Sequence, residues 1–227
     1  MNAVIAIDGP SGAGKGTVAR AVARTLAWKH VDTGAMYRAV AWKTREEGYR
    51  FDDEEAVTLI ASRSVFEVND LKVIIDGYDV TTAIRTSEID VAAATVARLP
   101  RVREVLVARQ RNYAALGPVV MEGRDIGTVV FPKASVKIYL DASPKERAKR
   151  RLKDPAHGLS SAGTVGFVAK ALQTRDALDR TRQASPLVRA IDATFIDTTG
   201  LSIDDVVSRV MQVIREKITI PRGDDLV

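Results

Sequence analysis

The chain has no cysteine, only two histidines and few aromatic residues. Aromatics make up 5% of its 227 residues. Without cysteine it can form neither disulfides nor thiolate metal sites, and the two isolated histidines, His30 and His157, disfavour a zinc site. Few aromatics leave little surface on which nucleobases could stack. These absences argue against disulfide-stabilised, zinc-dependent and single-stranded nucleic-acid-binding proteins.

The chain also lacks a long apolar run. None of its apolar stretches approaches the roughly 18 residues that span a bilayer, and no basic region precedes the short apolar stretch at the N-terminus. Charged residues make up 28% of the chain and hydrophobic residues 46%, a composition that favours a soluble protein with a sizeable core. We therefore expect a cytoplasmic protein without membrane contact. We also expect a monomer, although nothing in the composition bears on the oligomeric state.

The chain is basic, with a net charge of +5. A basic balance favours either nucleic acid or a small polyanion as the ligand. The arginines stand at separate positions rather than in one block, and no RNA-binding signature is present. We therefore expect a small polyanionic substrate and no nucleic-acid partner.

A glycine-rich segment near the N-terminus is the most informative part of the sequence. Residues 9–17 follow the apolar run at residues 3–7 and precede a helix-favouring stretch, the strand–loop–helix context of a phosphate-binding loop. Glycines let successive N–H groups and the start of the helix point at one anion. Lys15 supplies positive charge for the outer phosphates, and the Thr17 hydroxyl is the candidate Mg²⁺ ligand. The alternative is a flexible turn that contains a lysine by accident.

The loop departs from the general pattern Gly-x-x-x-x-Gly-Lys-Ser/Thr at one position. Gly16 stands where the hydroxyl residue is expected, and Thr17 follows it. The ending Lys-Gly-Thr resembles the loop of nucleoside monophosphate kinases, and residues 7–17 are similar to those of the bacterial cytidylate kinase family. The resemblance implies that the following residues cradle ATP: Gly9, Pro10, Ser11, Gly12, Ala13, Gly14, Lys15, Gly16 and Thr17.

Two further segments carry the same resemblance. Residues 32–38 read Asp-Thr-Gly-Ala-Met-Tyr-Arg, similar to the family's Asp-Ser/Thr-Gly-x-x-Tyr-Arg, and residues 123–128 match its Gly-Arg-Asp-x-Gly-Thr. The resemblance implies that Arg38 and Arg124 grip the acceptor phosphate and that Asp125 accepts a hydrogen bond from the cytosine amino group. The alternative for the second segment is a surface turn with an Arg-Asp pair.

Two predicted helices complete the implied acceptor site. The stretch Pro-Arg-Val-Arg at residues 100–103, with Gln-Arg at 110–111, resembles a family pattern that places Arg103 at the cytosine. The pattern at residues 175–182 implies a phosphate contact from Arg175. Without the resemblance, both would be interpreted as solvated basic helices with weak ion pairs. The implied acceptor-binding residues are Asp32, Thr33, Gly34, Arg38, Arg103, Arg124, Asp125, Arg175, Asp179 and Arg182.

One position departs from the family pattern. Family members often carry a serine nine residues before the arginine at the cytosine, and this chain has Ala94, followed by Thr95. Pyrimidine recognition would then use Thr95 or a water molecule.

A polar, glycine-bearing segment at residues 153–166 is flanked by arginines and resembles the mobile lid of these kinases; a disordered linker is the alternative. Arg147, Arg150 and Arg151 before it share one helical face. A closing lid would exclude water and bring arginines to the transferring group. The predicted catalytic residues are Lys15, Arg124, Arg147, Arg151 and Arg175.

The order of predicted elements indicates an α/β fold. Apolar strands alternate with helices, which predicts a parallel sheet of about five strands with helices on both faces. A hairpin at residues 64–76 interrupts this alternation. We expect a single P-loop kinase domain over residues 1–227, with an inserted acceptor-binding subdomain of antiparallel strands at residues 62–95 and the lid loop at 153–166.

The resemblance implies an ATP-dependent phosphotransferase that converts CMP or dCMP to the diphosphate, with ATP and CMP or dCMP as partners and Mg²⁺ as cofactor. Alternatives are a kinase for another monophosphate, such as UMP or AMP, and a nucleotide-hydrolysing ATPase. A GTPase would need an Asn-Lys-x-Asp motif, which the sequence lacks. Asp8, directly before the loop, is a candidate for orienting metal-bound water.

Overall fold

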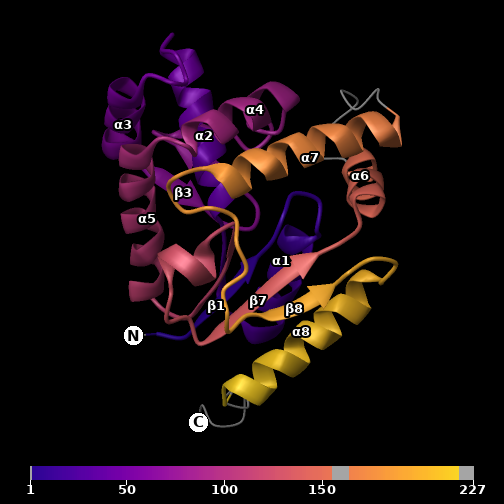
Figure 1. The fold of residues 1–227 in the computed structure, drawn as a ribbon. Helices are drawn as coiled ribbons and strands as arrows, with labels where there is room; N and C mark the ends of the chain where they lie inside the picture. The colour runs from indigo at the N-terminus through magenta and orange to yellow at the C-terminus, as the bar shows by residue number, and fades with distance from the viewer. Residues whose placement is uncertain (1, 155–163, 220–227) are drawn as a thin grey trace.

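The computed structural model describes residues 2–154 and 164–219. Most of the predicted lid loop, residues 155–163, lies outside the described residues. The centre of the molecule is a five-stranded sheet in which every pair of neighbouring strands is parallel (Figure 1). In sheet order its strands are β2 (Lys29–Asp32), β6 (Val119–Gly123), β1 (Val4–Asp8), β7 (Val136–Asp141) and β8 (Thr194–Asp197). The predicted parallel sheet is confirmed.

Helices cover both faces of this sheet, because its central strands are apolar on both sides. All five residues of β1 are buried, as expected for a strand in the middle of a parallel sheet. On one face, α1 (Lys15–Leu26) and α8 (Ile203–Lys217) share a core with β1 and β7. On the other face, α5 (Pro100–Ala115) packs with the π-helical turn η1 (Ile126–Val130). Sequence reasoning did not predict η1.

The inserted strands form a three-stranded antiparallel sheet rather than a simple hairpin. Its strands are β3 (Phe66–Val68), β4 (Val73–Ile75) and β5 (Tyr78–Asp79). Sequence reasoning ended the hairpin at Gly77. Asp76 and Gly77 both have positive φ, 50° and 80°, and this left-handed turn leads the chain into a third strand.

The inserted strands share one apolar core with the helices around them. These helices are α2 (Thr33–Glu46), α3 (Glu54–Arg63), α4 (Ser87–Val96) and α5. The buried residues of this cluster run from Ala35 to Leu106. The boundary at residues 62–95 for an acceptor-binding subdomain therefore stays a prediction, since the packing unit extends beyond it on both sides.

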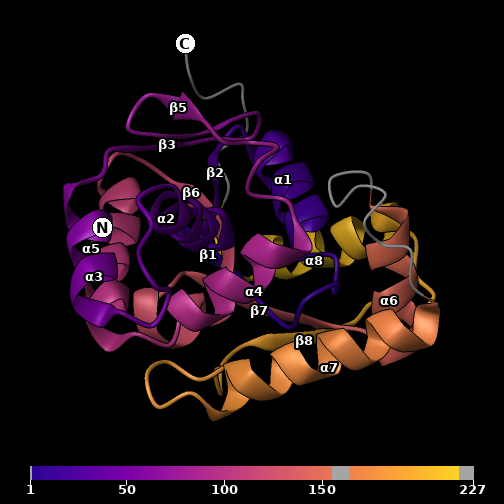
Figure 2. The same cartoon turned by 90° about the horizontal axis from the view of Figure 1, so that it is seen from above.

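Helices α6 (Pro144–Lys153) and α7 (Val165–Thr181) flank the predicted lid loop and pack against each other. The sequence Ser143-Pro144, a cap residue followed by a proline at the first helical position, predicts a helix that starts at Pro144. Helix α6 does start there, and the Ser143 side chain caps it by accepting a hydrogen bond from the Glu146 N–H. Seen from above, α7 lies along one side of the molecule, next to α4 and α6 (Figure 2).

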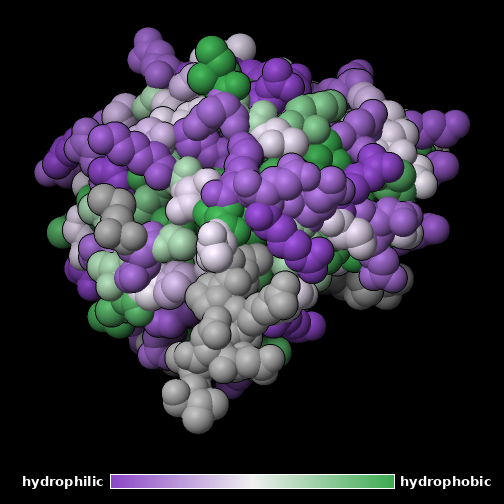
Figure 3. Space-filling view, turned by 90° about the horizontal axis from the view of Figure 1, so that it is seen from below, coloured by the Kyte–Doolittle hydropathy of each residue, from purple (hydrophilic) through white to green (hydrophobic). Residues whose placement is uncertain are grey.

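The face of the molecule seen from below carries many polar side chains, with apolar patches scattered among them (Figure 3). Within the described part of the chain, no helix is both long enough and apolar enough to cross a membrane.

Candidate functional site

A cleft lies at the carboxyl-terminal edge of the parallel sheet, where ligands bind in open α/β sheets. In the register of the sheet Asp8 lies opposite Gly123, and Asp32 lies opposite Glu122. The loops that follow β1, β2 and β6 therefore leave the sheet side by side. The cleft between them has a volume of about 740 Å³.

Most of the predicted site residues line this cleft. They are Ser11, Gly12, Ala13, Gly14, Lys15, Gly16, Thr17, Asp32, Thr33, Gly34, Arg38, Arg103, Arg124, Asp125, Arg151, Arg175, Asp179 and Arg182. Gly9, Pro10 and Arg147, which are also predicted site residues, are described by the structure but do not line the cleft.

The glycine-rich loop joins β1 to α1 and crosses very close to β7. A Cβ atom on Gly9 would lie 2.0 Å from the carbonyl oxygen of Leu140, and Gly9 also has a φ of 147°. Gly14, with a φ of 90°, turns the chain into α1, whose first residue is Lys15. Because a side chain would clash at Gly9 and strain the backbone at both glycines, only glycine allows this path. The amides at the start of α1 lie beside the cleft, as anion binding requires.

Lys15 is the buried cation of this loop. Its ammonium donates a hydrogen bond to the Pro10 carbonyl at 2.8 Å. Burial, with the positive charge of Arg124 as the second cause, lowers the pKa of Lys15 to about 7. A polyanion in the cleft would favour the protonated form, so the loop is suited to bind phosphate groups.

A network of charged side chains faces the loop from the other side of the cleft. Asp125 pairs with Arg103, and its other oxygen lies 3.6 Å from Arg182. Asp179 lies 2.9 Å from Arg124 and 3.8 Å from Arg182. Burial opposes the charge on Asp179, but Arg124, Arg175 and Arg182 outweigh it and lower its pKa.

This network joins residues that are far apart in the sequence. Arg103 comes from α5, Asp125 from the turn after β6, and Asp179 from α7. Buried donors within it make no hydrogen bond among the described residues: Nε of Arg103 and Nη2 of Arg182. A buried donor without a hydrogen bond is costly, so Nε of Arg103 indicates a polar ligand, whereas Nη2 of Arg182 keeps an ion pair with Asp125 at 3.6 Å.

A further arginine lies at the start of α2. Arg38 donates to the Asp32 carboxylate at 2.8 Å, and Asp32 also caps α2 by accepting from the Ala35 N–H. Thr33 donates to the backbone carbonyl of Glu122 at 2.7 Å. The end of β2 is thus tied to the end of β6, and Arg38 is held at the cleft.

A family model described as cytidylate kinase matches residues 5–216. Among relatives, a cytidylate kinase of Shewanella frigidimarina is 45% identical over 223 residues, covering 96% of this chain and 97% of the relative. A cytidylate kinase of Geobacillus sp. strain WCH70 is 45% identical over 222 residues, covering 96% and 98%. The chain belongs to the cytidylate kinase family. A cytidylate kinase of Escherichia coli O1:K1 / APEC is similar to it at 44% identity, with 96% and 97% covered.

Solved structures of low sequence identity share the fold of this chain. A gluconokinase from Sinorhizobium meliloti 1021 superimposes with a TM-score of 0.50 at 14% identity, covering 95% of this chain and 93% of that one. An uncharacterized protein from Eubacterium ventriosum gives a TM-score of 0.52 at 9% identity, covering 94% and 99%. At these identities the likeness concerns the fold alone.

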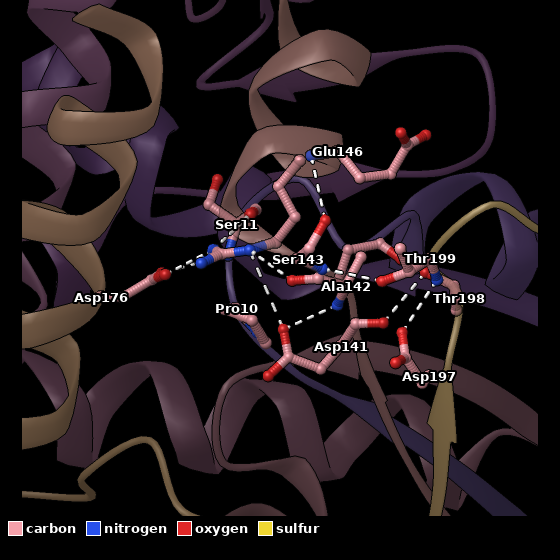
Figure 4. Close-up of polar contacts among 12 residues, drawn as sticks. Pro10, Ser11, Asp141, Ala142, Ser143, Glu146, Asp176, Asp197, Thr198 and Thr199 are labelled. Carbon is pink, nitrogen blue, oxygen red and sulfur yellow. Dashed lines mark hydrogen bonds and ion pairs between the residues drawn. The ribbon is translucent and has the colours of Figure 1, made fainter. Parts of the chain in front are cut away.

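Arg147 does not face the cleft of this cytidylate kinase family member, in contrast to the expected lid role. Its guanidinium is buried behind the phosphate-binding loop, where it pairs with Asp176. It also donates to the carbonyls of Ser11 at 3.0 Å and Ala142 at 3.1 Å. Figure 4 shows its partners Asp176, Ser11 and Ala142. Because its Nε and Nη1 donors are engaged, Arg147 supports the loop from behind.

Ala94 and Thr95 are placed differently from each other. Ala94 lines the cleft, whereas Thr95 is not part of the lining that the described residues form, and its hydroxyl donates back to the Val91 carbonyl at 3.4 Å. On a helix, adjacent residues point to different faces. Ala94 is therefore the residue of that pair that borders the cleft, and recognition of the pyrimidine by Thr95 or a water molecule stays a prediction.

Asp8 is also placed differently from the expectation that it orients metal-bound water. Its carboxylate accepts hydrogen bonds from the backbone N–H groups of Ile126 at 2.8 Å and Gly127 at 2.7 Å. Burial is the main cause that raises the pKa of Asp8 to about 6. Asp8 therefore positions the turn that presents Arg124 and Asp125.

Glu122 and Thr198 border the cleft but were missed by sequence reasoning. A Cβ on Gly16 would lie 2.8 Å from Oε1 of Glu122, so this buried carboxylate fills the space that a serine or threonine would need there. Thr198 accepts from Arg150 at 2.8 Å. Both residues lie at the carboxyl end of a strand, a position that could have singled them out.

Proposed function

We propose that this chain transfers the γ-phosphoryl group of ATP to CMP or dCMP, giving ADP and CDP or dCDP. One observation carries the proposal beyond the family name. The cleft has a phosphate-binding loop with Lys15 on one wall and a network of paired arginines and aspartates on the other. The two walls suit a triphosphate and a nucleoside monophosphate, respectively.

For this reaction the protein has to position the two nucleotides and neutralise the negative charge of their phosphates. The attacking group is a phosphate oxygen that is already anionic, so no general base is needed. Lys15 and the backbone N–H groups of residues 11–17 would hold the donor, while Arg38 and Arg124 would hold the acceptor phosphate. Arg151 and Arg175 would neutralise negative charge on the phosphoryl group during its transfer. These roles are part of the proposal, as are cytosine contacts from Arg103 and Asp125 and ribose contacts from Asp179 and Arg182.

The residues around the loop fit the Mg²⁺ that ATP-dependent phosphoryl transfer implies. The Thr17 side chain is exposed to the cleft, and the Glu122 carboxylate reaches the neighbouring Gly16. Mg²⁺ prefers oxygen ligands and often binds one or two protein groups together with substrate phosphates. Thr17, with Glu122 beside it, would hold the ion. When bound, it would neutralise charge on the phosphate oxygens.

Mg²⁺-ATP turnover with a panel of acceptors tests the proposal. ADP release would be measured with CMP, dCMP, UMP, AMP, GMP and no acceptor. We expect turnover concentrated on CMP and dCMP. Turnover on another monophosphate would keep the kinase chemistry but contradict the roles of Arg103 and Asp125. ADP release that needs no acceptor would contradict the kinase and indicate an ATPase.

We also propose that the chain acts as a monomer in the cytoplasm, without nucleic-acid or membrane partners. The scattered positions of the arginines support the absence of a nucleic-acid partner. Sedimentation at working concentration would test the monomer. Filter binding with RNA would test the absence of a nucleic-acid partner.

A further inference from the structure

Asp90 is a buried carboxylate in the wall of the cleft that has no part in the roles described above. It lies on α4, within the group of helices that packs with the inserted strands, and it lines the cleft. Its side chain is 8% exposed. A buried carboxylate is unfavourable unless positive charges or hydrogen bonds compensate for it.

Two arginines from different helices meet this carboxylate. Arg151, near the end of α6, pairs with one carboxylate oxygen, and Arg175 of α7 lies 3.2 Å from the other. Helices α6 and α7 are the two that flank residues 155–163. A single side chain on α4 thus joins both flanking helices to the acceptor side of the cleft.

The carboxylate offsets repulsion between cations that lie close together. Burial, with the positive charges of Arg175 and Arg38 as further causes, lowers the pKa of Arg151, and Asp90 opposes that effect. Without a negative charge between them, two guanidinium groups would move apart toward solvent. Asp90 is placed where it can keep them together.

Arg175 and the neighbouring Arg38 each keep a donor atom for a ligand. Arg175 contacts Asp90 through Nη1, while its buried Nε has no hydrogen-bond partner among the described residues. The same is true of Nε on the nearby Arg38. A guanidinium has five N–H donors in a fixed plane, so fixing one side of it sets the direction of the others.

We propose that Asp90 is a positioning residue, whose carboxylate holds the guanidinium groups of Arg151 and Arg175 together at the cleft so that their remaining donors meet the phosphoryl group during transfer. The proposal rests on the proposed kinase function and adds to it a residue that contacts no substrate. Asp90 acts through these two arginines.

Helix α4 does not depend on this carboxylate for its packing. Thr86 caps the helix, and Ile89, Ala92 and Ala93 bury its apolar face. The side chains of Arg151 and Arg175 are 20% and 21% exposed, so water can reach them if Asp90 is removed. Loss of the carboxylate should therefore affect catalysis more than folding.

The test compares Asp90→Asn and Asp90→Ala with Glu88→Gln. Glu88 lies on the same helix, and its exposed carboxylate pairs with Arg45 on the surface. We expect kcat of Asp90→Asn to fall about tenfold, as for a weakened charge clamp, with KM for CMP unchanged or lower. We expect Glu88→Gln to match wild type and Asp90→Glu to recover part of the loss. Urea unfolding would verify that each variant is folded.

The split between kcat and KM separates positioning from a simple charge effect. If Asp90 only contributes negative charge to the cleft, its removal should tighten nucleotide binding and leave kcat unchanged, and that result would overturn the proposal. A double-mutant cycle adds a second criterion. The loss from Asp90→Ala should largely disappear when Arg151 and Arg175 are already alanine, and an undiminished loss would also overturn it.

The proposed function and the role of Asp90 are tested by separate measurements, so the first can be contradicted while the second is still supported. The acceptor panel on wild type tests the function alone. The role of Asp90 is tested by the ratio of variant to wild-type turnover. This ratio is measured with whichever acceptor the wild type phosphorylates, or as ATP hydrolysis if the wild type phosphorylates no acceptor. If wild type prefers UMP but Asp90→Asn still loses kcat, the inference stands and the cytidine assignment fails.

Discussion

The two walls of the cleft use different physical means to bind phosphate. The donor wall is one continuous segment, residues 9–17, in which glycine conformations, the start of α1 and a single buried lysine form the site. The acceptor wall is made of charged side chains from separate helices and turns, and these side chains pair with one another. The first wall is mainly local backbone geometry, whereas the second requires the whole fold to bring its charges together.

Removal of the Lys15 ammonium should have the largest effect. For Lys15→Ala we expect kcat/KM to fall by about 10³-fold or more, because a charge that stabilises the transition state is lost. The fall should be equal for CMP, dCMP and UMP, since the donor wall does not contact the acceptor base. Steady-state kinetics with each acceptor would measure it.

Arg124→Ala is the matched change on the acceptor wall. We expect a loss of about 10²–10³-fold, the range for one removed transition-state donor. Near-wild-type turnover of this variant would contradict the proposed clamp. Unequal losses among acceptors in Lys15→Ala would contradict the separation of the two walls.

Arg147→Ala should mainly lower the free energy of unfolding and should have a smaller effect on kcat. The change leaves Asp176 buried without its cation, and breaking a buried pair in this way typically costs about 3–5 kcal/mol in the free energy of unfolding. Urea unfolding would measure the loss, with Lys149→Ala on the exposed side of α6 as control. A stable Arg147→Ala protein with greatly reduced kcat would instead support a catalytic role for Arg147.

ATP binding should take up a proton at Lys15 near pH 8. The pKa of Lys15 is lowered to about 7, so much of the lysine is neutral at pH 8, and bound triphosphate would restore its charge. Calorimetry of ATP binding in two buffers with different ionisation enthalpies would detect the uptake. It should vanish below about pH 6, where Lys15 is already protonated, and in Lys15→Arg, because arginine stays charged. Identical heats in both buffers would contradict it.

The smallest expected effect concerns His30, which connects the inserted strands with β6. His30 lies 2.7 Å from Asp70 and 3.4 Å from Glu122. Burial alone would lower the pKa of His30, but Glu122, Asp32 and Asp70 outweigh burial and raise it above its ordinary value of 6.5. Its stabilising contribution is therefore complete below pH 6.5 and is lost as the pH rises through the raised value.

Urea unfolding of wild type and His30→Gln at pH 6 and pH 9 would check this prediction. The difference in stability between the two proteins should be larger at pH 6. Equal differences at both pH values would show that the charge of His30 does not contribute.

Much of the fold followed from local signals. The apolar run at residues 3–7, the glycine loop and the Ser143-Pro144 cap each predicted an element that the structure contains, because each signal acts through its own backbone. The third inserted strand was missed although Asp76-Gly77 is a pair that favours positive φ in a two-residue hairpin turn, because the strand that follows, Tyr78–Asp79, is too short to show a pattern. The turn η1 was missed because Asp8, which is distant in sequence, holds it.

The candidate site shows the same division. Sequence spacing located the arginines on helices, but it could not tell that Arg147 points behind the loop while Arg151, one turn later, lines the cleft. Nor could it show that Thr95 bonds to its own helix or that Asp90 meets Arg151 and Arg175. These outcomes depend on how α4, α6 and α7 pack against one another.

The sequence by itself determined the phosphate-binding loop, the alternation that gives a parallel sheet and the resemblance to the cytidylate kinase family. Those features are encoded in contiguous residues, where glycine conformation and apolar periodicity act over a few positions. Only the tertiary structure decided which charged side chains face the cleft and which support it from behind. A charge on a helix is placed by the long-range packing that buries it, and its partner can lie anywhere along the chain.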